Sequence, residues 1–438
     1  MFCQLEVLRD CLPPSVRRTL DELPESLDET YERVLKEIKK PNRDHARRLL
    51  SCLVAALRPL RVEELAEVLA VDYEDEEGIP RLNPNWRWED EEQALLTSCS
   101  SLIAIVESGD SRVVQFSHFS VKEYLTSSRL ATSNGDALRY HISFEPAHTI
   151  LAQACLSTFL QSDDGIEQND AKTRSQLTEY AVEHWVAHAK YEKVSSHLRK
   201  AIEYLFDLDK PYFTAWRQLR GVDTNAHNGS TFYQFTGSNS DAVPLYYAAL
   251  CGFQDLVERL IFKYPQHVNA RGGYYVSPLV AALAGKHFQT ARILRDNGAD
   301  PDVRGLANRT PLHSAVYSGD VQTVRVLLEY KADVNARSIS GESPLHFLLD
   351  PLRYSDSDLP NVFQILLEHG ADANARENDL STPLHIAARN GKVEVVRLLL
   401  EHGASVDAED KEGRTPFHLA SFSGYSDVIE LLSEHGAK

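Results

Sequence analysis

The C-terminal half of the chain repeats one pattern of apolar and polar positions about every 33 residues. In most units a Ser or Thr followed by Pro opens a short apolar segment such as 384–389, and a glycine follows eight residues after the proline. A second segment then has apolar residues at helical spacing, as in Val393, Val396 and Leu399. Ser-Pro or Thr-Pro is typical of a helix start and glycine of a helix end, so each unit is predicted to be two helices and a turn.

No single unit of this kind can bury both of its apolar faces, so the units are expected to stack into an α-solenoid. Lys286 and Lys331 stand where neighbouring units have glycine, and each is predicted to cost about 1 kcal/mol in left-handed backbone. In the fourth unit Asp350-Pro351 breaks the first helix and residues 354–360 form a polar insertion. Insertions in repeats usually lie on one face, so this one is a leading candidate for a contact specific to this chain.

The N-terminal half lacks this period. The pattern predicts helices in the first 60 residues, one opened by a capping box from Ser26 to Glu29, and a helix whose apolar stripe begins at Val62. The acidic segment 72–92, which holds Trp86 and Trp88, is predicted to be a long surface loop.

Two apolar runs, 102–106 and 113–116, flank the polar residues 108–111 and predict a β-hairpin. A second capping box, Ser120 to Glu123, predicts a helix that continues through Leu130. Helices, a hairpin and a further helix are the outline of a winged-helix unit.

Charge and composition narrow the classes of partner. Lys plus Arg total 46 against 64 Asp plus Glu, and the net charge of -18 disfavours nucleic acid and anionic membranes as partners. No apolar run reaches the length of a membrane-spanning helix, and the N-terminus does not read as a signal peptide. The six cysteines never approach CxxC spacing, which indicates a reducing compartment and a cytoplasmic protein.

The period and the motif Thr-Pro-Leu-His resemble the ankyrin repeat. The motif or a variant of it stands at residues 243–246, 277–280, 310–313, 343–346, 382–385 and 415–418. In the N-terminal half, Leu23-Pro24, Arg58-Pro59-Leu60 and the segment 118–125 resemble the winged-helix region after the NACHT domain of fungal NLR-like proteins, which are signal-transducing P-loop NTPases. Residues 180–189 resemble the helical connector of the same family.

The resemblance implies a mainly α fold: a winged helix and helical connector followed by an α-solenoid of ankyrin repeats. We expect a helical segment at 1–57, the winged-helix domain at 58–132, the connector at 133–240 and six ankyrin repeats at 241–438. The P-loop of the NTPase is absent, because Gly285-Lys286 and Gly391-Lys392 lack the rest of its motif. The chain is therefore expected to be the C-terminal part of a longer protein.

His118 matches the winged-helix histidine that, in the family, contacts the β-phosphate of bound ADP. This role requires an NTPase domain supplied upstream or by another chain, and the alternative is a histidine packed between hairpin and helix. No cofactor is expected for this chain alone.

Other chemistries have weaker support. The repeat histidines recur one unit apart, too far to share one metal ion, and His184 with His188 lacks the Glu of the zinc-protease motif, so we expect no metal. DNA binding by the winged helix remains an alternative, with Arg43, Arg47 and Arg48 read as a solvated face. Similar winged-helix sequence occurs in inositol deacylases, but no hydrolase motif is present, so no enzyme is expected.

The sequence thus predicts a non-catalytic regulatory and recognition module whose ankyrin repeats bind a protein partner and which associates with a NACHT NTPase domain. Binding residues in such arrays lie on turn tips and exposed first helices. The candidates are Arg337, Glu342, Arg389, Asn390, Lys411 and Glu412. The alternative is a free-standing cytoplasmic ankyrin adaptor without a nucleotide switch.

Overall fold

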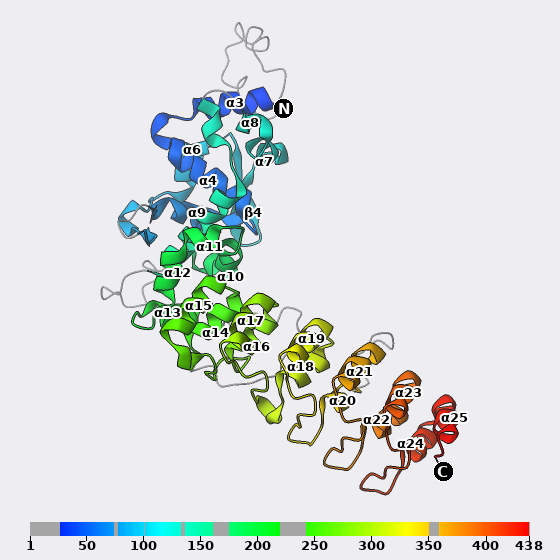
Figure 1. The fold of residues 1–438 in the computed structure, drawn as a ribbon. Coiled ribbons are helices and arrows are strands. Elements are labelled where there is room, and N and C mark those ends of the chain that lie inside the picture. Colours follow the sequence, from blue (N-terminus) through cyan, green and yellow to red (C-terminus); the bar gives the residue numbers. More distant parts are fainter. Residues whose placement is uncertain are drawn as a thin grey trace. The chain divides into compact units, whose positions relative to one another are not determined.

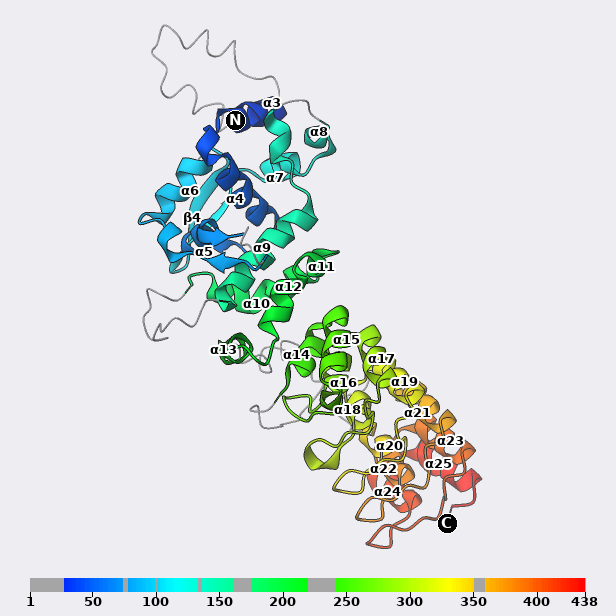
Figure 2. The same cartoon turned by 60° about the vertical axis from the view of Figure 1, so that its left-hand side comes forward.

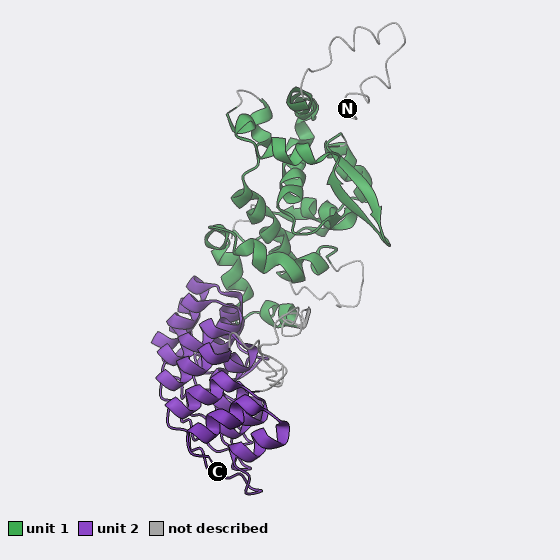
Figure 3. Cartoon of the chain, turned by 90° about the vertical axis from the view of Figure 1, so that its right-hand side faces the viewer, with its two compact units in different colours: residues 1–220 green, residues 221–438 purple. Residues whose placement is uncertain are grey.

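The computed structural model of the chain describes residues 27–73, 78–99, 101–132, 136–160, 175–219, 242–349 and 359–437. The chain divides into two compact units, residues 1–220 and 221–438 (Figure 3). Both units are mainly helical, and the strands belong to small sheets of the first unit (Figure 1). The mainly α fold predicted from the sequence is confirmed.

Helix α9 (Phe144–Phe159) is central to the first unit. It is apolar along most of its length and packs against α4 (Arg43–Ala55) and α10 (Thr178–Ala189). Trp185 of α10 is fully buried, and its ring meets Phe159 edge-on at 6.2 Å and Trp216 at 5.9 Å between centroids. The segment around Trp185 is therefore a structural helix, as its sequence indicated.

The winged-helix sheet has the strand order β1–β5–β4 and is antiparallel, with strands β1 (Leu60–Arg61), β4 (Ile103–Ser108) and β5 (Ser111–Phe116). Val114 is buried at the centre, opposite Leu60 on one side and Ile105 on the other. The hairpin predicted from the two apolar runs is confirmed, with the polar residues 108–111 at the turn between β4 and β5.

The helix after the hairpin differs from its prediction in two ways. Helix α7 (Phe119–Leu125) begins at His118, whose ring accepts the Ser120 N–H, so Ser120 is not the capping residue. The helix ends at Leu125 rather than Leu130, because Ser127 caps a separate helix, α8 (Ser128–Ala131), by accepting the N–H of Leu130 at 3.2 Å.

In the acidic segment 72–92, the described residues 72–73 and 78–92 include regular structure where a surface loop was predicted. Strands β2 (Val71–Asp72) and β3 (Arg81–Leu82) pair, a 3-10 turn η4 (Pro84–Trp86) follows, and helix α6 (Glu91–Cys99) begins inside the segment. Two-residue strands carry too little alternation for the sequence to reveal them. The first unit also contains α3 (Leu27–Glu37), η2 (Lys40–Asn42), α5 (Val62–Glu67), η3 (Val68–Ala70), η5 (Asp136–Tyr140), α11 (Val194–His197), α12 (Arg199–Leu205) and α13 (Tyr212–Leu219).

A buried carboxylate fixes the start of α5. Glu64 has no exposed side-chain surface and accepts a bidentate pair of hydrogen bonds from Arg58, at 2.7 and 2.8 Å. Arg61 adds a further bond at 2.9 Å, and Arg58 also lies over the ring of Tyr180 in α10 at 5.0 Å. Burial alone would raise the pKa of Glu64, but the bonds from Arg58 and Arg61 lower it below its ordinary value. The segment Arg58-Pro59-Leu60 thus connects the winged helix to the connector, because Arg58 contacts both Glu64 and Tyr180.

The second unit is a stack of helix pairs. In order they are α14 (Pro244–Cys251) with α15 (Gln254–Lys263), α16 (Pro278–Ala284) with α17 (Phe288–Asp296), α18 (Pro311–Ser318) with α19 (Val321–Glu329), α20 (Pro344–Phe347) with α21 (Leu359–Glu368), α22 (Pro383–Arg389) with α23 (Val393–Glu401), and α24 (Pro416–Ser423) with α25 (Ser426–Glu434). First helices pack on first helices, as α14 on α16 and α22 on α24, and second helices on second helices, as α15 on α17 and α21 on α23. The loops between successive pairs project from one side of the stack (Figures 1 and 2).

The backbone explains the recurring glycines and their two replacements. Gly252, Gly319 and Gly424 end their helices with φ between 73° and 79°, as predicted. Lys286 and Lys331 adopt the same left-handed conformation, with φ of 58° and 62°. The capping residue Ser26, Asp350-Pro351 and most of the predicted insertion 354–360 lie outside the described residues, and α21 begins at Leu359.

Candidate protein-binding surface

Three consecutive ankyrin units are each tied to the next unit through a motif histidine, His313, His346 or His385. In the unit of α18, His313 Nδ1 accepts the N–H of Thr310 at 3.2 Å, so the proton lies on Nε2, which donates to the carbonyl of Glu342 in the next unit at 3.1 Å. Burial lowers the pKa of His313 to about 4, so this imidazole is neutral at pH 7. His346 and His385 make the equivalent bonds to Ser381 and Arg414. These three histidines therefore connect neighbouring units.

The loops before the first helices are joined by main-chain hydrogen bonds. We call residues 304–310, 337–343, 376–382 and 409–415 the finger loops. Ile339 N–H donates to the Ala307 carbonyl at 2.8 Å, Asn378 N–H to Ser340 at 2.9 Å and Lys411 N–H to Asp379 at 2.8 Å. These bonds hold the loops side by side in one continuous surface.

Three consecutive finger loops expose an apolar side chain. The exposed fractions are 52% for Leu306, 70% for Ile339 and 40% for Leu380, and we call these three residues the tip ridge. Leu306 and Ile339 occupy the same position, five residues before the proline. The last finger loop carries Lys411 there, and Lys411 is exposed. Adjacent exposed apolar residues with a polar rim are typical of protein-binding surfaces.

The structure places four of the six predicted binding residues in the finger loops and two at the end of α22. Arg337 is exposed and donates to the Arg376 carbonyl at 2.5 Å, whereas Glu342 is half-buried and accepts from Ser338 Oγ at 3.0 Å. Asn390 Nδ2 donates to the Leu349 carbonyl at 2.8 Å, which ties two units together. Glu412 pairs with Arg414, while Arg389 and Lys411 are exposed.

Sequence reasoning missed the tip ridge because helical periodicity does not extend into loops. Superposing the units on their prolines would have shown apolar residues at loop positions where other units have Gly, Asn or Lys.

The finger loop 376–382 also has a carboxyl group with a raised pKa, that of Glu377. Burial, together with Asp379 and Glu342, raises the pKa of Glu377 to about 7, and the Arg389 guanidinium opposes this shift. The loop therefore carries less negative charge at pH 7 than its sequence suggests.

The winged-helix candidate, His118, lies on the surface. Its Nδ1 accepts the Ser120 N–H at 3.3 Å and lies 2.6 Å from Ser120 Oγ, which in turn lies 2.8 Å from the hydroxyl of Tyr31. The ring also contacts Phe119, which is 71% exposed, with centroids 4.3 Å apart. His118 is thus exposed rather than packed inside, and Nε2 is the ring nitrogen that these bonds do not use.

A second histidine group lies in the core of the first unit. His188 Nε2 is 2.8 Å from the Tyr180 hydroxyl and His188 Nδ1 is 2.7 Å from His148 Nδ1. Burial lowers the pKa of His188 to about 3, with further contributions from His148 and His184, so the imidazole is neutral. Within the described residues, no group of three or more His, Cys, Asp or Glu side chains is arranged to hold a metal ion.

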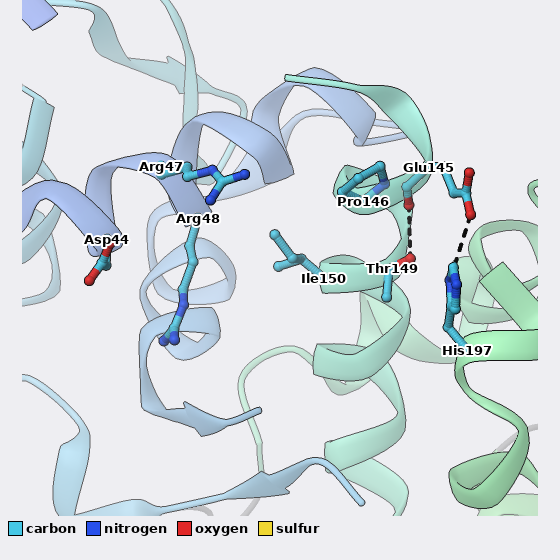
Figure 4. Close-up of a pocket in the computed structure, with 8 residues that line it drawn as sticks. All are labelled: Asp44, Arg47, Arg48, Glu145, Pro146, Thr149, Ile150 and His197. Atoms are coloured by element: carbon cyan, nitrogen blue, oxygen red, sulfur yellow. Dashed lines mark hydrogen bonds and ion pairs between the residues drawn. The ribbon is translucent and has the colours of Figure 1, made fainter. Parts of the chain in front are cut away.

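A cavity of about 540 Å³ lies between α4, α9 and α11 (Figure 4). It is lined by Asp44, Arg47, Arg48, Glu145, Pro146, Thr149, Ile150 and His197. Glu145 pairs with His197 at 3.6 Å, and Arg48 lies over the Tyr73 ring at 4.7 Å. Arg47 and Arg48 therefore line a cavity of mixed charge instead of an open basic face, and Arg43 pairs with Asp136 at 3.2 Å. None of the described helices is long and apolar enough to cross a membrane.

Comparison with known proteins agrees with both units. Residues 245–338 and 354–438 match ankyrin repeats, in three copies, and residues 31–135 match the winged helix domain of GPI inositol-deacylase. The chain is also similar to the azaphilone pigments biosynthesis cluster protein L of Monascus ruber, with 30% identity over 295 residues that cover 64% of this chain. The match covers 61% of that relative's length.

The matches identify a domain type in each of the two units, a winged helix in the first and ankyrin repeats in the second. Ankyrin repeats are non-catalytic protein-interaction modules, and the finger loops are their exposed loops here. The winged helix, with Arg58 and Glu64 at the start of α5, precedes them in the chain. The chain therefore combines a winged helix of the GPI inositol-deacylase type with ankyrin repeats, an order that is similar to the C-terminal part of fungal NACHT-ankyrin proteins.

Proposed function

We propose that this chain is a cytoplasmic, non-catalytic recognition module that binds a protein partner through the tip ridge and the exposed charges around it. The observation that carries the proposal is the exposure of Leu306, Ile339 and Leu380 on loops that main-chain hydrogen bonds hold together. A surface fixed before binding loses little conformational entropy when a partner docks. Arg389 and Lys411 flank the ridge and would set the orientation of the partner.

The test is affinity purification of the tagged full-length chain from cells that express it, compared with the variant Ile339→Asp. A carboxylate at the centre of the ridge is expected to weaken capture of the partner by about ten-fold or more, because it would be buried without a counter-charge. Arg397→Asp is the matched control, since Arg397 is half-exposed on the second helix α23, away from the finger loops. Equal capture by wild type and Ile339→Asp, with normal folding of both, contradicts the proposal.

The charged candidates have their own test. We expect Arg389→Glu and Lys411→Glu each to reduce capture by about three- to ten-fold, with a stronger effect at low salt. Asn390→Ala is expected to lower stability more than binding, because Asn390 bonds to the Leu349 carbonyl. Unchanged capture by both charge reversals would restrict the surface to the tip ridge.

We further propose that the winged helix and connector regulate a NACHT NTPase domain supplied by another segment or chain. Support comes from the resemblance and from the exposed His118, whose Nδ1 is used as a cap while Nε2 is left for another group. One imidazole is not a nucleotide site, so this chain alone is not expected to bind ADP. The test is ADP binding by the chain with and without an added NACHT domain.

His118→Ala should weaken ADP binding by the combined proteins, whereas Phe119→Ala, a neighbouring surface change, should not remove a phosphate contact. The free-standing adaptor is the other outcome: partner capture that is unchanged by nucleotide or by an added NACHT domain supports it. Partner binding through the tip ridge is common to both.

A further inference from the structure

Two of the four tryptophans lie on the surface of the first unit. Trp185 and Trp216 are fully buried, whereas Trp86 is 48% exposed and Trp88 is 47% exposed. Both exposed indoles stand on the short segment between β3 and α6. Large aromatic side chains that remain on a surface are enriched at protein-binding sites.

The backbone between the two tryptophans is held in place from the inside. Arg87 is extended, with φ of -66° and ψ of 138°, and its guanidinium makes two bonds to the buried carboxylate of Glu67, at 2.6 and 3.0 Å. Arg87 points inward to Glu67, while the indoles before and after it, Trp86 and Trp88, both reach solvent. Because Arg87 is already held by Glu67, binding of a partner there loses little conformational entropy of the segment.

The segment is also fixed at its beginning. Asn83 N–H donates to the Ala70 carbonyl at 2.9 Å, and Asn83 Oδ1 accepts the Asn85 N–H at 3.1 Å to cap η4. After Trp88 the chain enters α6, where Asp90 Oδ1 accepts the Gln93 N–H at 2.9 Å. The tryptophan pair therefore stands between a strand pair and a helix rather than on a free loop.

The charges around the pair are mainly negative. Glu89 and Asp90 are exposed next to Trp88. Two guanidinium groups of this region have carboxylate partners, Arg87 with Glu67 and Arg112 with Glu92 at 2.5 Å. Burial raises the pKa of Glu91, and the carboxylates of Glu63 and Glu67 add to this rise while Arg112 and Arg87 oppose it.

We propose that Trp86 and Trp88, with Glu89, Asp90 and Glu91, form a docking surface for a basic, arginine- or lysine-rich segment of a protein partner. We call it the tryptophan patch. A guanidinium over an indole face gains cation–π attraction, and the carboxylates beside it complement its charge. The same carboxylates repel anionic lipid, so a membrane surface is not the occupant. The patch lies in the first unit and does not depend on the tip ridge.

The test uses the tryptophans as their own reporters in the full-length chain. The probe is an unlabelled octapeptide of alternating Arg and Gly, which does not fluoresce. We expect it to shield Trp86 and Trp88 from acrylamide quenching, while Trp185 and Trp216 are shielded already, and we expect binding to weaken as salt is raised. A Glu-Gly octapeptide, a Leu-Ser octapeptide and phosphatidylcholine–phosphatidylserine vesicles are the comparison probes.

Variants locate the site. By calorimetry with the Arg-Gly peptide, the double variant Trp86→Ala and Trp88→Ala is expected to bind at least about ten-fold more weakly, and Glu89→Lys about three-fold more weakly. Replacing both tryptophans by Phe should keep most of the affinity, which separates loss of the aromatic faces from misfolding. Phe119→Ala, which removes another exposed aromatic side chain of the first unit, is the control and should leave peptide binding unchanged.

Three results would overturn the proposal: equal affinity of the wild type and the double alanine variant, no protection from acrylamide at millimolar Arg-Gly peptide, or tighter binding of the Leu-Ser peptide or the vesicles than of the Arg-Gly peptide. The last result would assign the patch to an apolar partner or a lipid surface.

Discussion

The two units stabilise buried polar side chains over very different distances in the sequence. In the ankyrin stack His313 and His385 each bond to a carbonyl 29 residues away, and the same bond recurs from unit to unit. In the first unit the bond from Leu57 to Tyr180 spans 123 residues, and His148 meets His188 40 residues away, each contact being used once. A repeated short-range contact makes the stack a sum of neighbour interfaces, whereas single long-range contacts make the first unit depend on particular residues.

The largest effect is expected in the first unit. Glu64→Ala should lower its free energy of unfolding by about 3 kcal/mol, because Arg58 and Arg61 lose a buried carboxylate partner. Urea unfolding followed by tryptophan emission measures this, since Trp185 and Trp216 are both in the first unit. Glu63→Ala is the control: Glu63 is half-buried and pairs with Arg61 at 3.6 Å, so a change below about 0.5 kcal/mol is expected. Equal losses would remove the special role of Glu64.

Acid should weaken the ankyrin stack through its buried histidines. The pKa of His313 and of His346 is lowered to about 4 by burial, so between pH 6.5 and pH 4 the unfolded state binds more protons than the folded state. Stability is therefore complete above pH 6.5 and falls as the pH decreases, by on the order of 1 to 2 kcal/mol for each histidine at pH 5. Far-ultraviolet circular dichroism during urea titrations at pH 7 and pH 5 measures the loss. A pH-independent midpoint would show that these imidazoles are not buried as neutral groups.

Removing a motif histidine compares an internal unit with the last one. His313→Ala should cost about 2 kcal/mol, because it removes the His313 half of the capping box of α18 and the bond to the Glu342 carbonyl. His418 makes the local bonds to Thr415 but is exposed in the last pair of helices, so His418→Ala should cost about 1 kcal/mol. The difference between the two losses of stability measures the hydrogen bond between units. Equal losses for His313→Ala and His418→Ala would show that the whole effect comes from capping.

The smallest effect concerns the backbone of the repeat turns. Lys331→Gly should raise stability by about 1 kcal/mol, because Lys331 adopts a left-handed φ of 62°. Gly403, the equivalent residue, has φ of 80°, and a Cβ added there would meet nothing within 4 Å. Gly403→Lys should therefore lower stability by a similar amount through backbone strain alone. Thermal unfolding of the wild type and of the two variants measures both stability changes. A Lys331→Gly variant that is less stable than the wild type would contradict the account.

The sequence predicted what depends on periodicity and missed what depends on single contacts. The helix pairs, the hairpin and the left-handed lysines follow from spacing and backbone preference. The burial of Glu64 and Glu67 was not predicted, because the hydrophobic pattern places charged residues on the surface. In the structure Arg58 and Arg87 neutralise these two carboxylates, so both can be buried. His118 caps α7 in place of Ser120, a choice between two polar residues that spacing does not decide.

The binding surface was only partly predictable. The finger loops were expected to carry the site, and charged residues were chosen because they are free of packing. Glu342 instead bonds to Ser338 within its own loop, and Asn390 bonds to the Leu349 carbonyl of the preceding unit. Leu306 and Ile339 are exposed, which can be recognised only from the folded arrangement of the loops. The six charged and polar candidates remain predictions until a partner is tested.

Site-specific photo-crosslinking tests the central claim, partner binding by the tip ridge, most directly. Benzoylphenylalanine at residue 339 of the full-length chain, irradiated in cells that express it, should give a discrete protein adduct, and the same substitution at residue 306 should give the same adduct. At residue 397, on the half-exposed outer surface of α23, no such adduct is expected. Adducts of equal yield at 397, or none at 339 and 306 while the tagged chain still captures its partner, would contradict the account.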